Sequence, residues 1–471
     1  MVTNHPTTLV IFGATGDLAD KKLIPAIFDL YNQNVLPADF RIVGFSRKDL
    51  KDNDYREFIK KSLEKAGKDT STRNCHTFLQ RSFYTKGDIT SLDTYKSLAK
   101  YLNDLDKESS VCTNKLFYLA VPPTLYETIF SLLSQSGMAI PCANVPGENR
   151  EVWTRVLVEK PFGSNIEEAR KLDLLLGELF NEKQIFRIDH YVAKETMQNI
   201  LMFRFANAIF ESVWNNEYIE KVELKIHEKF GIEDRVVFYD GVGALRDVGQ
   251  NHLLQMLALI AMEDPKDLTP EAIHKARIEV LKMVTPFKDN DNFAYRGQYE
   301  GYTDADGVDN ESQTETYFKL KMGVKNKRWK GVPFYLEAGK ALKDTKTEIV
   351  ITFKEIESCV CPSHQKRDHA NKITFELKPE DKITICFWAK KPGLGLELEE
   401  RDLTFKYDSK ERLPDAYERV LHDAIKGDQT LFTSTEEVIR QWNIITPICH
   451  DWDDMPLVMY KKGDDPKEWG K

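Results

Sequence analysis

The stretch from Arg187 to Asn199, RIDHYVAKETMQN, concentrates side chains that could do chemistry. In an extended segment Asp189 and His190 point to opposite faces, so one could orient a catalytic group while the other faces a pocket. His190 and Lys194 are four residues apart, and a helix that begins by Tyr191 would bring both side chains to its first turn. A helix N-terminus with nearby Lys and His binds anions. The stretch predicts a site for a phosphorylated substrate; an ordinary capped helix start with surface ion pairs is the alternative.

A glycine-rich turn follows the first apolar run of the chain and comprises Gly13, Ala14, Thr15, Gly16, Asp17 and Leu18. Glycines let backbone N–H groups approach a pyrophosphate closely at the start of a helix. The spacing GxxGxxA differs from the usual GxGxxG, but a position between a strand and a helix supports the interpretation. After the second expected strand, Ser46, Arg47 and Lys48 occupy the place where NAD sites carry an acidic residue. Two cations there suit a 2′-phosphate, which favours NADP.

Lys160 lies in the segment EKPFG, at the end of an expected buried strand. In a doubly wound sheet the carboxyl ends of the strands face the ligand crevice, so this lysine could touch both cofactor and substrate. We expect that Pro161 can adopt the cis form and hold a sharp turn. A plain turn with an exposed lysine is the alternative.

His252 is the candidate general base, in a segment DVGQNH that opens into an apolar helix. Removing a hydride from a carbinol requires a base for the hydroxyl proton, and neutral His suits that role near pH 7. A carboxylate on its far nitrogen would fix the tautomer. A histidine satisfied inside the core is the alternative, but Asp247 beside it and Glu228 upstream favour a catalytic role.

Length and composition limit the class of protein. With 471 residues and a net charge of −9, the chain is long enough for two domains and is not a nucleic-acid-binding type. No apolar run predicts a membrane span or a signal peptide. Seven cysteines, without regular spacing, predict reduced thiols. The spacing of one donor cluster does not fit common zinc sites, and we expect a loop without metal at Cys359, Cys361, His364 and His369.

The element pattern changes along the chain. Strands and helices alternate up to residue 184, which predicts an α/β Rossmann domain with a doubly wound parallel sheet over residues 1–184. Residues 185–471 predict a larger α+β domain with a big, mostly antiparallel sheet, because alternating strand patterns crowd together there. Long helices are expected at Lys194–Asn215 and from about Gly243 to Met262.

Six segments resemble, in this order, those of the glucose-6-phosphate 1-dehydrogenase family: GATGDLA, EKPFG, RIDHYVAKETMQN, DVGQNHLLQ, VPFYLEAGK and PDAYERVLHDAIKGD. Together they cover nearly the whole chain. The resemblance implies an NADP-dependent oxidation of D-glucose 6-phosphate at C1 to 6-phospho-D-glucono-1,5-lactone, the first step of the oxidative pentose phosphate pathway. It also implies a cytoplasmic homodimer or homotetramer formed through the large sheet, with no nucleic acid or membrane partner.

The resemblance also implies a role for each matching position. His252 looks like the general base and Asp189 like the carboxylate that orients it. The substrate positions are His190, Tyr191 and Lys194 for the phosphate, Glu228 and Asp247 for sugar hydroxyls, with Lys160 and Lys340 as further contacts. The cofactor positions are the turn from Gly13 to Leu18, Arg47 for the 2′-phosphate, Lys160, and Tyr126 beside the nicotinamide.

The chain departs from the family pattern at Glu337, Thr345 and Lys378. Some animal members hold a second, structural NADP⁺ with arginines, and two of the matching positions here are Glu337 and Glu376. Carboxylates repel a phosphate, which predicts one NADP⁺ per chain. The glutamates are expected to pair with lysines such as Lys340, Lys372 and Lys378.

Two other functions stay open at this point. One is an oxidoreductase for an unphosphorylated sugar, against which the presence of His190 and Lys194 argues. The other is a catalytically silent NADP-binding sensor, against which Asp189 and His252 argue.

Overall fold

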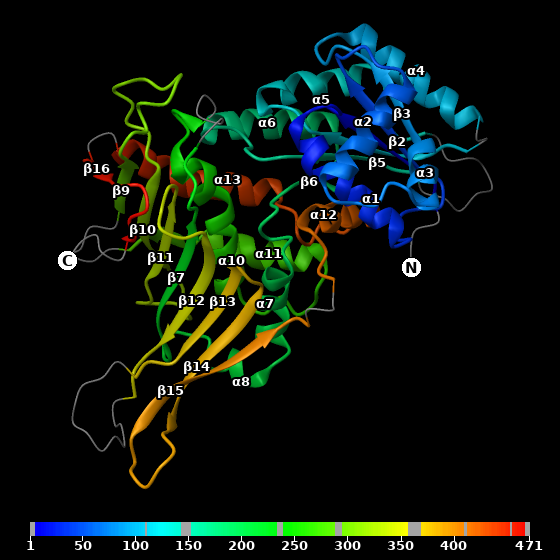
Figure 1. Cartoon of the computed structure of the whole chain (residues 1–471). Helices are drawn as coiled ribbons and strands as arrows, with labels where there is room; N and C mark the ends of the chain where they lie inside the picture. Colours follow the sequence, from blue (N-terminus) through cyan, green and yellow to red (C-terminus); the bar gives the residue numbers. More distant parts are fainter. Residues whose placement is uncertain are drawn as a thin grey trace. The chain divides into compact units, whose positions relative to one another are not determined.

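The computed structural model describes residues 5–108, 111–142, 152–232, 239–287, 294–356, 369–408, 412–452 and 455–466 (Figure 1). The chain divides into two compact units: Met1–Ala193 with Pro414–Thr435, and Lys194–Leu413 with Glu436–Lys471. The expected boundary after residue 184 differs from this division in two ways. The RIDHY turn up to Ala193 belongs to the first unit, and a late segment of the chain returns to that unit.

The sheet of the first unit is parallel, as the alternation predicts. Within the described residues its strands lie in the order β3-β2-β1-β4-β5-β6. They are β1 (Thr7–Phe12), β2 (Phe40–Ser46), β3 (Ser82–Lys86), β4 (Asn114–Leu119), β5 (Thr154–Val158) and β6 (Ile185–Arg187). Every residue of β1 is buried, which is typical of a central strand covered on both faces.

Helices of the first unit pack on the two faces of this sheet. They are η1 (Ala19–Leu23), α1 (Ile24–Asn32), α2 (Asp52–Lys65), α3 (Arg73–Gln80), α4 (Leu92–Glu108), η2 (Pro123–Leu125), α5 (Tyr126–Gln135), α6 (Ile166–Leu179), η3 (Glu182–Gln184) and α12 (Ala416–Lys426). Side chains alternate along β1. Leu9 and Ile11 join one core cluster with residues of α1, α2, α3 and α12, while Phe12 on the other face contacts Tyr95 of α4 at 5.7 Å between ring centroids.

Helix α12 is the part of the returning segment that packs into the first unit. Its N-terminus is closed by Asp415, whose side chain accepts the N–H of Tyr417 at 2.9 Å, and its last turn ends at Gly427 with φ +82°. Arg155 of β5 donates to the carbonyls of Ala424 and Ile425 at 2.7 and 2.8 Å. A guanidinium on the terminal carbonyls of a helix complements its dipole, so Arg155 fixes α12 to the sheet.

The second unit contains a ten-stranded, mostly antiparallel sheet within the described residues, as the crowded strand pattern predicts. The order along it is β15-β14-β13-β12-β7-β11-β10-β9-β16, and β8 pairs with β10. The strands are β7 (Ile219–His227), β8 (Val284–Pro286), β9 (Ala294–Tyr299), β10 (Tyr317–Val324), β11 (Phe334–Gly339), β12 (Lys346–Phe353), β13 (Lys372–Lys378), β14 (Lys382–Lys390), β15 (Leu398–Lys406) and β16 (Leu457–Tyr460). Two neighbouring pairs are parallel, β7 with β11 and β16 with β9.

Helices of the second unit are α7 (Glu195–Phe205), α8 (Ala208–Glu211), η5 (Leu245–Leu253), α10 (Leu254–Ala261), α11 (Pro270–Leu281) and α13 (Thr435–Asp451), whose first residue falls in the first unit. The expected continuous helix Lys194–Asn215 is wrong, because Asn207 is extended (φ −127°, ψ 105°) and separates α7 from α8. The Asn207 amide donates to the carbonyl of Phe203 at 3.2 Å and helps to end α7. The second expected helix is confirmed as η5 followed directly by α10.

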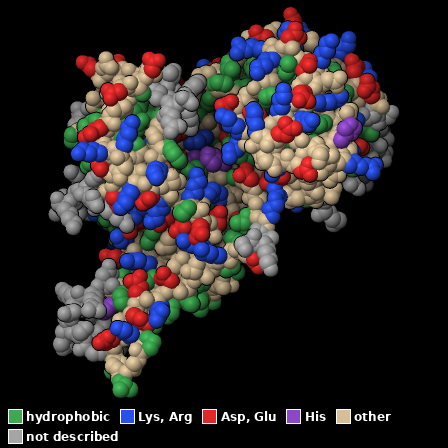
Figure 2. Space-filling model, in the orientation of Figure 1, with side chains coloured by type: hydrophobic (Ala, Val, Ile, Leu, Met, Phe, Trp, Pro, Cys, Tyr) green, Lys and Arg blue, Asp and Glu red, His purple; other side chains and the backbone are tan. Residues whose placement is uncertain are grey.

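Acidic and basic side chains are interspersed on the face drawn in Figure 2. Among the residues that the structure describes, no helix combines the length and apolar character needed to cross a membrane.

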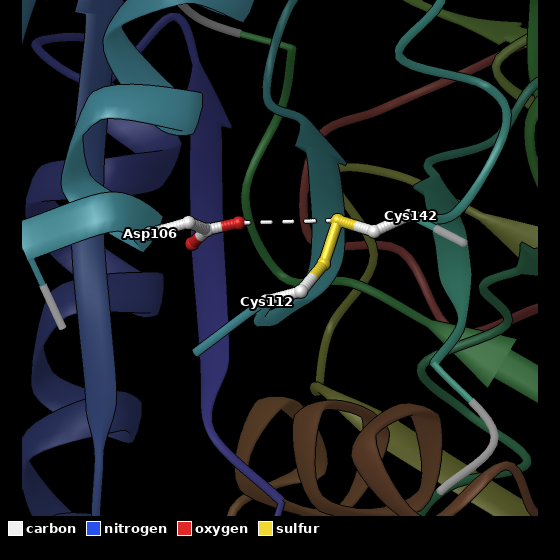
Figure 3. A group of neighbouring side chains, drawn as sticks. All are labelled: Asp106, Cys112 and Cys142. Atoms are coloured by element: carbon white, nitrogen blue, oxygen red, sulfur yellow. Dashed lines mark hydrogen bonds between the residues drawn. A yellow bond between two sulfur atoms is a disulfide. The ribbon is translucent and has the colours of Figure 1, made fainter. Parts of the chain in front are cut away.

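Two of the cysteines correct an expectation. Cys112 and Cys142 form a disulfide (Figure 3), so the prediction that all seven are reduced thiols is wrong for this pair. The fold brings their Cα atoms to 6.5 Å, a proximity that spacing in the sequence does not reveal.

Of the cluster at which the sequence predicts a loop without metal, Cys359, Cys361 and His364 lie outside the described residues.

We expect Arg155→Ala to lower the free energy of unfolding by about 2–4 kcal/mol, because two charge-assisted hydrogen bonds and the stacking of the guanidinium 3.8 Å from the Trp153 ring are lost. Urea unfolding, followed by circular dichroism, measures this change in the free energy of unfolding. Arg170→Ala, at an exposed position on α6, is the matched control and should change stability by no more than about 0.5 kcal/mol. Equal effects of the two variants would contradict the role of Arg155.

Candidate functional site

The glycine-rich turn lies where the sequence predicts it, between the buried strand β1 and the helix that follows. Gly13 has φ +78°, and a Cβ there would lie 2.4 Å from the carbonyl oxygen of Ala120. Gly16 donates its N–H to the Gly13 carbonyl at 2.9 Å, and helical structure begins at Asp17. Gly16 and Asp17 are exposed, so the start of the helix is open to a ligand. A tight turn that leads into an accessible helix N-terminus suits a pyrophosphate.

The end of β2 lies beside this turn. The hydroxyls of Thr15 and Ser46 are 3.2 Å apart, and Ser46 also hydrogen-bonds the hydroxyl of Tyr84 at 2.8 Å. Tyr84 donates to the carbonyl of Lys48 at 2.7 Å as well, which holds the backbone after the strand. Arg47 follows Ser46 directly and is exposed. The structure thus brings together two motifs that are about thirty residues apart in the sequence.

The EKPF turn closes the carboxyl end of β5. The Lys160–Pro161 peptide bond is cis, as expected. Glu159 accepts a hydrogen bond from the Tyr118 hydroxyl at 2.5 Å through its carboxylate, and its backbone carbonyl accepts one from Tyr126 at 3.0 Å. Burial raises the pKa of Glu159 to about 7, although the Tyr118 hydroxyl and Lys160 oppose that rise. Tyr126 is buried and holds the backbone from which Lys160 projects.

The RIDHY segment is a turn after β6 and not the start of a helix. Helix α7 begins at Glu195, so the expected convergence of residues in a helical first turn is wrong. Asp189 is buried and accepts the N–H of Tyr191 at 3.0 Å, which is a typical Asx turn. The ring of His190 lies 4.9 Å from that of Tyr191 and, nearly parallel, 6.5 Å from that of Tyr417 on α12. The sequence did not indicate Tyr417.

In the second unit, Lys340 lies at the centre of a charged group. It contacts the carboxylate of Glu228, lies 3.8 Å from that of Asp247, and its ammonium is 5.4 Å from the centre of the Tyr239 ring. Glu228 and Lys340 each come one residue after a strand, β7 and β11, and these strands are parallel. Their ends therefore meet at one edge of the sheet. Two carboxylates and one ammonium there can hold several sugar hydroxyls.

Lys194 is also part of the second unit, at the N-cap position of α7. Its ammonium donates to the carbonyl of Leu377 at 2.8 Å. This contact anchors the lysine at the start of a helix, where its charge and the N-terminal N–H groups favour an anion.

Asp247 and His252 share the helix η5, which has π-helical geometry. Such geometry is rare and is frequently found at functional sites. His252 is 1% exposed and Asn251 donates to the carbonyl of Asp247 at 3.1 Å. The expected hydrogen bond between Asp189 and His252 joins residues of different units and stays a prediction.

Comparisons with known proteins agree over both units. Residues 10–199 match the model of the glucose-6-phosphate dehydrogenase NAD binding domain, and residues 201–470 match that of the C-terminal domain. The glucose-6-phosphate 1-dehydrogenase of Borreliella burgdorferi is 38% identical, over 98% of this chain and 95% of that protein. The cytoplasmic glucose-6-phosphate 1-dehydrogenase 6 of Arabidopsis thaliana is also 38% identical, over 98% and 89%. A solved glucose-6-phosphate dehydrogenase in complex with its substrate glucose-6-phosphate has a TM-score of 0.88 and 33% identity, over 99% and 97%.

The chain belongs to the glucose-6-phosphate dehydrogenase family. It is accordingly an oxidoreductase with a nucleotide-binding domain.

Two of the positions at which this member of the glucose-6-phosphate dehydrogenase family departs from the pattern, Glu337 and Glu376, have partners inside the large sheet. Glu337 is buried, lies 2.8 Å from the His227 ring nitrogen and 3.8 Å from the ammonium of Lys319. Glu376 pairs with Lys382 at 3.0 Å. The partners expected from the sequence are other lysines, namely Lys340, Lys372 and Lys378. The observed partners differ because the cross-strand register, which the sequence does not reveal, decides which side chain faces each glutamate.

Glu315 is a residue that sequence reasoning missed. It is 6% exposed, and its carboxylate accepts the N–H of Leu245, the first residue of η5, at 2.9 Å. Its backbone carbonyl accepts the N–H of Ala244 at 3.0 Å, and a Cβ on Gly243 would lie 2.3 Å from the carboxylate oxygens. Glu315 thus caps the helix that carries Asp247 and His252. Burial raises its pKa to about 7, opposed by backbone hydrogen bonds and nearby arginines.

This raised pKa predicts how stability depends on pH. Because the folded chain holds the Glu315 proton up to about pH 7 while an unfolded chain releases it near 4.5, Glu315 stabilises at low pH and that contribution is lost as the pH rises between those values. Glu315→Gln keeps an acceptor for Leu245 without the charge. We expect its stability relative to the parent to rise from pH 4.5 to pH 8 by at most about 3 kcal/mol.

Urea unfolding at both pH values measures this difference. Glu311→Gln, at an exposed position nearby in the chain, is the control and should show none of it. A Glu315→Gln variant whose relative stability falls as the pH rises would reverse the sign and contradict the argument.

Proposed function

We propose that this chain oxidises D-glucose 6-phosphate at C1 to 6-phospho-D-glucono-1,5-lactone with NADP⁺ as hydride acceptor. The observation that carries the proposal is the match of both halves of the chain to the two domains of one enzyme family. Relatives of nearly equal length bear the name of that enzyme, and a structural neighbour is described with glucose-6-phosphate bound.

The substrate's two polar ends are assigned to different groups of side chains. His190, Tyr191 and Lys194 bind the phosphate, because a cation, an imidazole and a helix N-terminus favour a dianion. Glu228, Asp247 and Lys340 bind sugar hydroxyls, supported by their mutual contacts at the edge of the large sheet. Lys160, held by the anchored EKPF turn, contacts both substrate and cofactor.

His252 acts as the general base. Its neutral imidazole takes the proton of the C1 hydroxyl while the hydride departs from the same carbon, which leaves the lactone carbonyl. Asp189 accepts a hydrogen bond from the other ring nitrogen and stabilises the imidazolium that forms. The burial of both side chains supports this assignment, since water would weaken the electrostatic stabilisation.

The residues of the first unit fit a nicotinamide dinucleotide that carries a 2′-phosphate. The turn Gly13–Leu18 leads from β1 into a helix start at which Gly16 and Asp17 are exposed, and such a start suits a pyrophosphate. Thr15, Ser46 and Arg47 lie together at the end of β2, where the guanidinium can clasp the 2′-phosphate. Tyr126 lies on the nicotinamide side. When bound, the cofactor supplies the hydride acceptor, and each chain takes one.

The chain assembles as a homodimer or homotetramer through the large sheet. Strand β15 forms one edge of it, and exposed apolar side chains on this strand include Leu403 at 61% and Phe405 at 48%. A second copy of the chain would remove them from water. A cytoplasmic location is supported by the cytoplasmic relative.

The test is the reduction of nicotinamide, followed at 340 nm, with glucose 6-phosphate, glucose and other sugar phosphates, each with NADP⁺ and NAD⁺. Use of glucose as efficiently as its phosphate would favour an enzyme for unphosphorylated sugars. No turnover with any sugar would favour a silent nucleotide-binding protein.

We expect His252→Asn to lower kcat by about 10²–10⁴-fold and to leave KM for glucose 6-phosphate within a few-fold, because the proton acceptor is removed and the binding groups remain. Steady-state kinetics measure both constants. His450→Asn, at an exposed position on α13, is the control and should retain the parental kcat. A His252→Asn variant with near-parental kcat would exclude this base.

We expect Arg47→Ala to raise KM for NADP⁺ by about 10-fold or more and to change KM for NAD⁺ little, because only NADP⁺ carries the 2′-phosphate. Arg73→Ala, also exposed in the first unit, is the matched control for the loss of one positive charge. An unchanged ratio of the two KM values would show that Arg47 does not read the 2′-phosphate.

A further inference from the structure

The disulfide between Cys112 and Cys142 lies in the first unit and is not part of the site described above (Figure 3). Cys112 stands just before β4, and Cys142 follows α5. The bond closes a loop with a sequence separation of 30, which contains β4 and α5. It therefore ties the exit of one helix to the entry of a central strand.

The position of the bond separates it from the nucleotide turn. Cys112 precedes the amino end of β4, whereas Gly13 follows the carboxyl end of β1, and the two strands are parallel neighbours. A six-residue strand measures roughly 20 Å, so the disulfide and the turn lie at opposite edges of the sheet. The cysteines therefore lie away from the nucleotide turn, although Tyr126 of α5 is inside the loop that the bond closes.

The surroundings favour a covalent bond between the two sulfurs over a shared metal ion. Asp106 of α4 points toward Cys142, with its carboxylate 4.0 Å from the sulfur (Figure 3). The same carboxylate oxygen pairs with the ammonium of Lys115 at 2.6 Å, and the other accepts the Thr113 hydroxyl at 2.9 Å. Two thiolates and this carboxylate could ligate Zn²⁺, but the dication would lie beside a buried ammonium.

The two cysteines of the pair are less buried than two of the free cysteines. Cys112 and Cys142 are half-buried, whereas Cys75 and Cys386 are 0% and 7% exposed. Thiol–disulfide exchange requires a thiolate to approach one sulfur in line with the bond, so exposure decides which cysteines exchange. Among the described cysteines, the pair combines accessibility with a partner at bonding distance.

We propose that Cys112 and Cys142 form a reversible redox-modification site, which a dithiol reductant opens and the corresponding disulfide closes. A thiolate of the dithiol attacks one sulfur, and the other cysteine leaves as a thiolate that takes up a proton. The second thiol of the reductant then attacks the mixed disulfide and releases the first cysteine. Two electrons pass from the dithiol to the pair, and the reductant departs as a disulfide.

Formation of the disulfide raises the stability of the chain and leaves its catalytic rate unchanged. Closing a loop of this length reduces the conformational entropy of the unfolded chain, so the oxidised form unfolds at a higher temperature. For a unit of this size the expected difference in Tm is about 5–10 °C. Because the pair is remote from the nucleotide turn, kcat should agree within about twofold between the two forms.

The test uses the full chain equilibrated with oxidised or reduced dithiothreitol. Thiols are blocked with iodoacetamide and the peptides are identified by mass spectrometry, while Tm and kcat are measured on the same samples. We expect a Cys112–Cys142 linked peptide only in the oxidised sample, two newly alkylated cysteines in the reduced one, and the stated loss of Tm. Cys112→Ser and Cys142→Ser should show the lower Tm in both buffers, and Cys449→Ser should respond as the parent does.

Three outcomes would overturn the proposal. The first is alkylation of both cysteines in oxidised dithiothreitol. The second is a linked peptide that persists in reduced dithiothreitol. The third is one Zn²⁺ per chain that co-purifies with the parent and is lost in Cys112→Ser. Peptide mapping of the parental chain decides the question even where a serine variant fails to fold.

Discussion

Two strands that run parallel and hydrogen-bond to each other end at the same edge of their sheet, and the candidate site residues depend on this constraint. In the first unit the nucleotide turn, Arg47 and Lys160 all follow parallel strands. The second unit is mostly antiparallel, yet its one central parallel pair, β7 with β11 in the described sheet, is the pair after which Glu228 and Lys340 occur. An antiparallel arrangement of these two strands would place the carboxylate and the ammonium at opposite edges.

Two carboxyl groups with raised pKa values, Glu159 and Glu315, lie near these strand ends. Glu159 lies in the EKPF turn and Glu315 at the start of η5, and burial raises the pKa of each to about 7. Tyr118 and the N–H of Leu245 offset part of the free-energy cost of desolvating these carboxylates. The pKa values stay raised, so both groups reduce stability at neutral and higher pH while they fix segments that carry Lys160 and Asp247. This is the usual conflict between stability and a pre-organised site.

Local pattern was sufficient to predict elements whose residues share one environment. The buried run of β1, the helix α2 and the crowded strands after residue 316 follow from periodicity and burial alone. Local pattern did not predict features that depend on contacts between residues distant in the sequence. Helix α12 returns to the first unit through Arg155, and β8, β9 and β16 pair with strands far away in the sequence. Tyr417, Glu315 and the disulfide are products of such contacts, so no local spacing indicates them. The break at Asn207, by contrast, involves a local contact with Phe203 that periodicity does not indicate.

The register of neighbouring strands also decides which side chains face the glutamates of the large sheet. Glu337 lies beside the His227 ring and the Lys319 ammonium, and Glu376 lies beside the Lys382 ammonium. The pKa of Glu337 stays below its ordinary value although burial opposes this, because His227 and the lysines favour the charged form. These partners lie on strands adjacent to those of the glutamates. The sheet balances its buried charge internally, so a bound anion at Glu337 would have to displace a pairing that the fold itself supplies.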